Sequence, residues 1–132
     1  MAEICMVSLV IPIESFDIER SVIFPHFGRA PEFAVIDLSH EGRVISITSE
    51  RNVGEHFGGH GGPETVVTSL KPDVLVVKGM GPRRLAAFQS NGIAVFTGSV
   101  NNLGEAVEAY LAGRLSCLTE PCKDACHGLP HS

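Results

Sequence analysis

The chain has 132 residues and a mass of 14.1 kDa, the size of a single domain with one hydrophobic core. Hydrophobic residues make up 44% and charged residues 19%, so the chain can bury enough apolar surface to fold. A net charge of -5 argues against nucleic-acid binding, which needs a basic surface. No apolar stretch approaches the roughly 20 residues of a membrane helix, and Glu3 stands where a secretory signal carries positive charge. We therefore expect a cytoplasmic protein without a membrane segment.

The first third of the chain predicts three strands. Residues 4–11 are almost continuously apolar and end at Pro12, which is typical of a central strand covered on both faces. Residues 12–29 show no sustained period and predict a loop. Glu32–Leu38 and residues 43–50 predict two strands joined by a tight turn. The second of these alternates with period two, which indicates an antiparallel strand with one solvent-facing side.

The second half predicts alternating helices and strands, after a loop at residues 51–62 that contains five glycines. Proline is favoured at the first position of a helix and glycine just beyond its end. These signals predict a helix from Pro63, a buried strand at 74–78, a helix from Pro82 to Gly92, a strand at 93–97, and a helix capped by Asn102 and ended by Gly113.

This order of elements predicts an α/β fold. Right-handed crossovers place the later strands on the opposite side of the sheet from the hairpin. We expect a mixed five-stranded sheet of order 3-2-1-4-5, with strand 2 antiparallel and helices on both faces, in a ribonuclease-H-like arrangement. The domain is expected to span residues 1–115, followed by a cysteine-bearing tail at 116–132.

The segment HFGRAPEF at residues 26–33 resembles the HFGRA-type motif of the dinitrogenase iron–molybdenum cofactor biosynthesis family, the NifX-like domains. Weaker matches at 73–82, 91–96 and 105–113 extend the resemblance over residues 3–115. It implies a ribonuclease-H-like fold that binds or carries a metal–sulfur cluster of the iron–molybdenum or molybdenum–copper type, without catalysis. It also implies that cofactor-assembly or acceptor proteins are partners. The motif implies a cofactor-binding segment made of His26, Phe27, Gly28 and Arg29, with His26 as the metal ligand.

The chemistry of the histidines agrees with this implication. A neutral imidazole suits iron, copper, zinc or molybdenum, and Pro25 and Gly28 allow the backbone to expose His26 in a loop. The alternative for His26 is a loop histidine bonded to a carbonyl. His56 and His60 lie in the glycine-rich loop, which departs from the family pattern; they either close around the cargo or are solvated.

A second candidate segment follows the predicted strand at 74–78. Gly79 and Gly81 precede a helix N-terminus, where free N–H groups and the helix dipole favour an anion, and Lys78 and Arg83 lie at the same end. The alternative is a tight turn with solvated arginines, above all Arg84. A dinucleotide site is excluded because an arginine stands where the third glycine of GxGxxG belongs.

These two segments are predicted to share one pocket. Ligand sites in open α/β sheets lie beyond the carboxyl ends of the strands, where the strand order reverses. The loop after the first strand carries His26, and the loop after the fourth carries Gly79 and Gly81. We expect all three in a single pocket that His56 or His60 can approach.

The tail adds Cys117, Cys122 and Cys126, with His127 beside them. Three thiolates predict a zinc or iron–sulfur site or a redox pair, whereas the alternative is a disordered terminus. The alternative function for the chain is accordingly a zinc- or redox-sensing scaffold acting through these thiols. A nuclease is not expected, because the first strand carries no carboxylate and Asp37 stands nearly alone.

Overall fold

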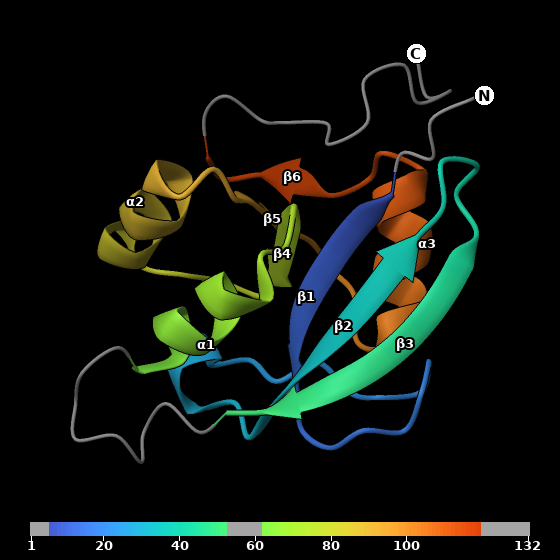
Figure 1. Ribbon diagram of the computed structural model, residues 1–132, viewed down its shortest axis with the longest axis horizontal. Helices are drawn as coiled ribbons and strands as arrows, with labels where there is room; N and C mark the ends of the chain where they lie inside the picture. Colours follow the sequence, from blue (N-terminus) through green and yellow to red (C-terminus); the bar gives the residue numbers. More distant parts are fainter. Residues whose placement is uncertain (1–5, 53–61, 120–132) are drawn as a thin grey trace.

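The computed structural model describes residues 6–52 and 62–119, in which six strands form one mixed sheet (Figure 1). The strands are β1 (Val7–Ile13), β2 (Glu32–Leu38), β3 (Val44–Arg51), β4 (Val74–Val77), β5 (Ala94–Thr97) and β6 (Ser116–Cys117). The helices are α1 (Gly62–Leu70), α2 (Pro82–Ser90) and α3 (Leu103–Leu111), with a 3-10 turn η1 (Phe27–Arg29). In the described part of the chain, no helix is long and apolar enough to cross a membrane.

The strand order is β3-β2-β1-β4-β5-β6. β1 pairs antiparallel with β2 and parallel with β4, and β4 pairs parallel with β5. The predicted order of the first five strands and the antiparallel second strand are therefore confirmed. The sheet has six strands and not five, because Ser116–Cys117 pairs antiparallel with β5. A two-residue strand has no periodicity from which it could be predicted. The ribonuclease-H-like classification stays an expectation.

The predicted end of the first strand was wrong, because Pro12 lies inside β1. Its carbonyl accepts a hydrogen bond from Phe24 N at 2.9 Å, and its nitrogen faces the same side, away from β2. The parallel pairing with β4 involves only Leu9 and Val10. The missing N–H therefore removes no ladder hydrogen bond, and the strand continues to Ile13. β1 also begins at Val7, three residues later than predicted, and α2 and α3 end two residues before Gly92 and Gly113; the bounds of the other predicted strands and the helix starts agree to within one residue.

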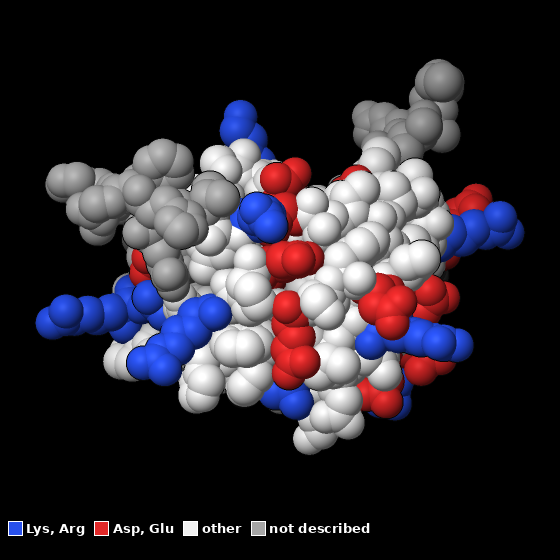
Figure 2. Space-filling view, turned by 90° about the horizontal axis from the view of Figure 1, so that it is seen from below, with Lys and Arg blue, Asp and Glu red and all other residues white. Residues whose placement is uncertain are grey.

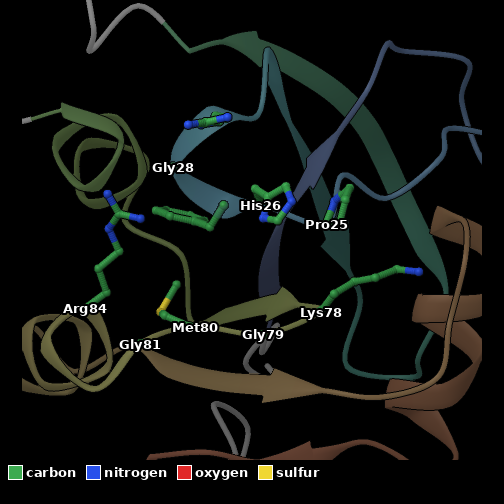
Figure 3. Close-up of a pocket in the computed structure, with 10 residues that line it drawn as sticks. Pro25, His26, Gly28, Lys78, Gly79, Met80, Gly81 and Arg84 are labelled. Atoms are coloured by element: carbon green, nitrogen blue, oxygen red, sulfur yellow. The ribbon is translucent and has the colours of Figure 1, made fainter.

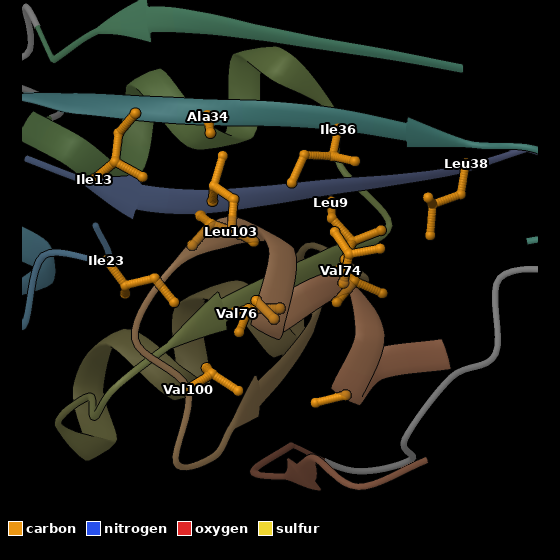
Figure 4. Close-up of a cluster of buried hydrophobic side chains, with 14 of the residues drawn as sticks. Leu9, Ile13, Ile23, Ala34, Ile36, Leu38, Val74, Val76, Val100 and Leu103 are labelled. Atoms are coloured by element: carbon orange, nitrogen blue, oxygen red, sulfur yellow. The ribbon is translucent and has the colours of Figure 1, made fainter. Parts of the chain in front are cut away.

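Helices cover both faces of the sheet, as predicted. On one face α3 contributes Leu103 to a cluster with Leu9, Ile36 and Val74 (Figure 4). On the other face, α1, α2 and η1 pack against Val10 and its neighbours. Successive residues of a strand point to opposite faces, so a strand buried on both sides has to be continuously apolar. This double burial explains the apolar run of β1.

The connection between β1 and β2 determines where the motif at residues 26–29 lies. The chain turns back along β1, with Ile13 bridged to Ile23 and Glu14 N donating to Val22 O at 2.9 Å. The Phe24–Pro12 hydrogen bond then brings residues 25–29 to the carboxyl end of β1. Because β4 is parallel to β1, its carboxyl end lies at the same edge of the sheet.

Candidate functional site

A pocket of about 840 Å³ opens at the edge of the sheet where β1 and β4 end (Figure 3). Its walls are residues 25–29, the turn 78–81 after β4, and Arg84 of α2. The structure therefore brings His26, Gly79 and Gly81 together in one pocket, as the sequence predicted. His56 and His60 lie outside the described residues, so their approach to the pocket stays a prediction.

His26 is an exposed residue at the mouth of this pocket. Its backbone is extended, with φ -111° and ψ 104°, and its ring packs edge-on against Phe24 at a centroid distance of 6.3 Å. Its carbonyl accepts from Arg29 N at 3.0 Å, but its ring makes no hydrogen bond within residues 6–52 and 62–119. The alternative of a carbonyl-bound imidazole is therefore not observed, and neither ring nitrogen has a hydrogen-bond partner among the described residues.

Phe27, the next residue of the motif, lines the pocket from within the hydrophobic core. It is only 3% exposed, and its ring lies 5.4 Å from that of Phe33 and 5.6 Å from that of Phe88. Aromatic pairs at these separations stabilise the fold beyond their buried area. The ring thus anchors η1 to the core, which positions His26 and Gly28 on either side of it.

Arg84 forms the opposite wall of the pocket. The alternative interpretation of the sequence had this arginine solvated, but it is only partly exposed. Its Cζ atom lies 5.4 Å from the centroid of Phe27, and its Nε donates to Glu64 Oε2 at 2.8 Å. A Cβ atom on Gly28 would lie 2.7 Å from Arg84 Nη1, so a side chain at this position would require the guanidinium group to shift. Arg83, the predicted binding residue, is exposed and does not line the pocket.

Arg84 lines the pocket and Arg83 does not, for a geometric reason. Consecutive residues of an α-helix project about 100° apart, so α2 can direct only one of them toward η1 and α1. Glu64, on α1, selects Arg84 by pairing with it. Sequence reasoning missed this pair because the two residues belong to different helices and share no local spacing.

The remaining charges of the lining are positive. Arg29 is exposed, and Lys78 Nζ donates to the neutral Asn101 Oδ1 at 3.3 Å, so neither side chain forms an ion pair with another described residue. The lining contains no carboxylate among the residues that the structure describes. Because Arg84 is already paired with Glu64, Arg29 and Lys78 supply the positive potential.

Gly79 and Gly81 are not required by the protein's own packing. Neither has a positive φ, and a Cβ atom at either position would meet no atom of the described residues within 4 Å, apart from the chain neighbours. Gly81 is also the N-cap residue of α2, with no side chain to accept from the first N–H groups. Glycines without a conformational need leave room for a ligand to approach the backbone, and an uncapped helix N-terminus favours an anion.

A site for a bare metal ion is not formed by the described residues, since they contain no group of three His, Cys, Asp or Glu that could hold one. Cys117 lies in β6 and is disulfide-bonded, so in this state its sulfur is not a thiolate. Cys122 and Cys126 lie outside the described residues. Metal binding by the C-terminal cysteines therefore stays a prediction.

Comparison with solved structures shows the same fold in other proteins. The PH0822 protein superimposes with a TM-score of 0.70 at 23% identity, covering 89% of this chain and 100% of its own. The apo orange protein from Desulfovibrio gigas gives 0.69 at 22% identity, covering 83% and 91%. The Thermotoga protein TM1290 gives 0.64 at 21% identity, covering 89% and 98%.

Sequence comparison identifies the family. A search of curated proteins gives no match. The family described as dinitrogenase iron-molybdenum cofactor matches residues 7–113, which is most of the chain and includes every residue of the pocket. The chain therefore belongs to the dinitrogenase iron-molybdenum cofactor family.

Proposed function

We propose that this protein binds an anionic metal–sulfur cluster in the pocket and carries it during cofactor assembly or delivery to an acceptor protein. The observation that carries the proposal is the composition of the lining: one imidazole, His26, faces Lys78 and the uncapped start of α2, with no carboxylate among the described lining residues. Metal–sulfide clusters and their organic acid ligands are negatively charged, and this lining is complementary to them.

The same lining distinguishes a pre-assembled cluster from a single metal ion. A bare cation needs several protein ligands, and Arg29 and Lys78 would repel it. A cluster brings its own sulfide ligands, so one imidazole from His26 suffices to fix its orientation. The family name favours a cargo of the iron–molybdenum type, and a molybdenum–copper cluster is the other cargo to be tested.

The proposal includes no catalytic step. Within the described lining no hydroxyl or thiol nucleophile stands beside a base, and no pair of carboxylates is present. Glycines 79 and 81 give access to the backbone, and Phe27 fixes the shape of the wall. These features are suited to binding a ligand and supply no group that would catalyse a reaction of it.

Anaerobic reconstitution tests this function. The protein is incubated with molybdate, sulfide and either ferrous iron or copper, desalted, and examined by metal analysis and visible absorption. Wild type is expected to retain metal and sulfide, and His26→Ala to lose most of both. His40→Ala is the matched control, because His40 is exposed in the turn after β2, at the opposite end of the sheet. Equal retention by His26→Ala and wild type would overturn the proposal.

A second candidate function acts through the C-terminal thiols, and the disulfide bond of Cys117 favours a redox role over a zinc role. Under this candidate, reduction changes the protein's properties while the pocket stays intact. Zinc titration of the reduced and oxidised protein separates the two roles. Zinc binding only after reduction supports a zinc site, whereas a reversible disulfide without zinc binding supports redox sensing.

A further inference from the structure

A second cavity lies on the α3 face of the sheet. It shares no residue with the pocket lined by residues 25–29, 78–81 and Arg84, called the cofactor pocket below. It is an apolar groove of about 320 Å³ between α3 and the strand β3. Three apolar side chains along it are largely exposed: Ile18 at 53%, Val44 at 46% and Leu111 at 40%. The full lining is Ile18, Glu19, Val44, Ile47, Leu103, Gly104, Val107, Glu108 and Leu111. Apolar surface of this kind, bounded by polar residues, is typical of an interaction site.

The groove runs beside an open edge of the sheet. β3 is the terminal strand of the sheet and pairs only with β2 among the described strands. Beyond the irregularity opposite Leu38, residues 46–49 of β3 include no charge and no proline, which are among the usual means of blocking an edge. The unpaired backbone groups of β3 can therefore bind an added strand, whose side chains on one face would enter the groove.

Ile18 is held at the groove in a strained conformation. Its φ of 51° is rare for a β-branched residue, which loses energy in the left-handed region. Ser21 fixes the turn, because its Oγ donates to Ile18 O at 2.7 Å and accepts from Asp17 N at 2.7 Å. Gly104 N, in the first turn of α3, donates to Glu19 O at 3.0 Å. The exposed position of Ile18 is thus imposed by a turn that is bonded to α3.

We propose that this groove and the edge of β3 dock an extended, basic segment of a partner protein. The only charged residues of the described lining are Glu19 and Glu108, so lysine or arginine side chains of the partner would pair with them. The chain as a whole has a net charge of -5, and Figure 2 shows one face on which a band of acidic side chains is flanked by Lys and Arg side chains.

The charges also favour a foreign partner over a second copy of the chain. Symmetric pairing of two β3 edges would bring both copies of Glu19 and Glu108 toward one interface, and like charges at close range oppose association. Because the groove and the cofactor pocket share no residue, this proposal is independent of the proposed cargo.

The test uses a short fluorescein-labelled peptide of alternating valine and lysine, with binding followed by fluorescence anisotropy. We expect binding to wild type that weakens as salt rises. The double variant Glu19→Lys/Glu108→Lys should bind about tenfold more weakly. Glu14→Lys is the control, because Glu14 is exposed in the same loop but does not line the groove. No binding of the peptide to wild type, or equal affinity of the double variant, would overturn the proposal.

Two further measurements separate docking from folding and from self-association. Ile18→Asn relieves the strain, so the midpoint of thermal unfolding should not fall while the peptide affinity does. A lower midpoint with unchanged affinity would show that Ile18 is purely structural. Sedimentation is expected to give a monomer for wild type. A dimer that dissociates in Val44→Glu would identify a second copy as the occupant and contradict the proposal.

Discussion

The two cavities are built from the same connection between β1 and β2, yet their chemistry is opposite. The part at residues 25–29 forms a wall of the pocket, where the free charges are positive and glycines expose the backbone. The part around Ile18 and Glu19 forms the rim of the groove, which is apolar and acidic. Because the segments turn to opposite faces of the sheet, one loop can serve an anionic cargo and a basic partner without the two competing.

The largest effect is expected from Phe27→Ala, which removes the anchor of the pocket wall. The ring is buried against Phe33 and Phe88, and loss of such a side chain costs about 3–5 kcal/mol. The free energy of unfolding, measured by urea denaturation, should fall by this amount, and cargo retention should fall with it. A stability close to that of wild type would mean that η1 is not anchored by its aromatic residue.

Truncation after Gly113 should have the next largest effect. It removes β6 and the contact of Leu115 with the core, and Val95 N loses the bond that it donates to Thr119 Oγ1 at 3.2 Å. We expect cooperative thermal unfolding to persist with about 2 kcal/mol less stability. The groove, which lies near the other edge of the sheet, should bind its peptide as before. Loss of cooperativity would show that the residues after Gly113 are required for the fold.

A smaller effect is expected from Arg84→Met, which keeps the length of the side chain but removes its charge. The pair with Glu64 is partly exposed, so its loss together with the stacking on Phe27 should cost about 1 kcal/mol. Arg83→Met is the matched control at the neighbouring, exposed position, and it should leave the free energy of unfolding in urea unchanged. Equal effects of the two changes would contradict the role of Arg84 as a wall of the pocket.

The smallest change in stability is expected from Gly79→Ala. Apart from its chain neighbours, no described residue has an atom within 4 Å of the new methyl group, so the fold should be unaffected or gain about 0.4–1 kcal/mol through a less flexible unfolded chain. Cargo retention after reconstitution should nevertheless decrease, because the methyl group enters the space left beside the backbone. Undiminished retention would show that the glycine does not serve ligand access.

The sequence was sufficient for the features that depend on local patterns. Proline at the start of α2 and the Asn102 cap of α3, which accepts from Glu105 N at 2.9 Å, were predicted from the residues alone. The shared pocket followed from the topology of parallel strands. The choice of Arg84 over Arg83 and the continuation of β1 through Pro12 could not be predicted, since both depend on contacts between segments distant in the sequence.

The backbone conformation at the groove was also not predictable from the sequence. Ile18 lies in a stretch without period, and nothing in its neighbours predicts a left-handed backbone at an isoleucine. The hydrogen bonds of Ser21 and the contact with α3 produce it. The predicted alternation of β3 holds only in part. A β-bulge opposite Leu38 interrupts the register, so that Val44 and Ile47 both line the groove.

The position of Phe27 couples ligand binding in the pocket to the stability of the protein. Its ring belongs to the core while its two neighbours face the ligand space, so the native turn exists only when that part of the core is formed. A ligand that binds the native turn and not the unfolded chain stabilises the protein by RT ln(1 + [L]/Kd). The melting temperature therefore reports directly how much of the protein carries its ligand.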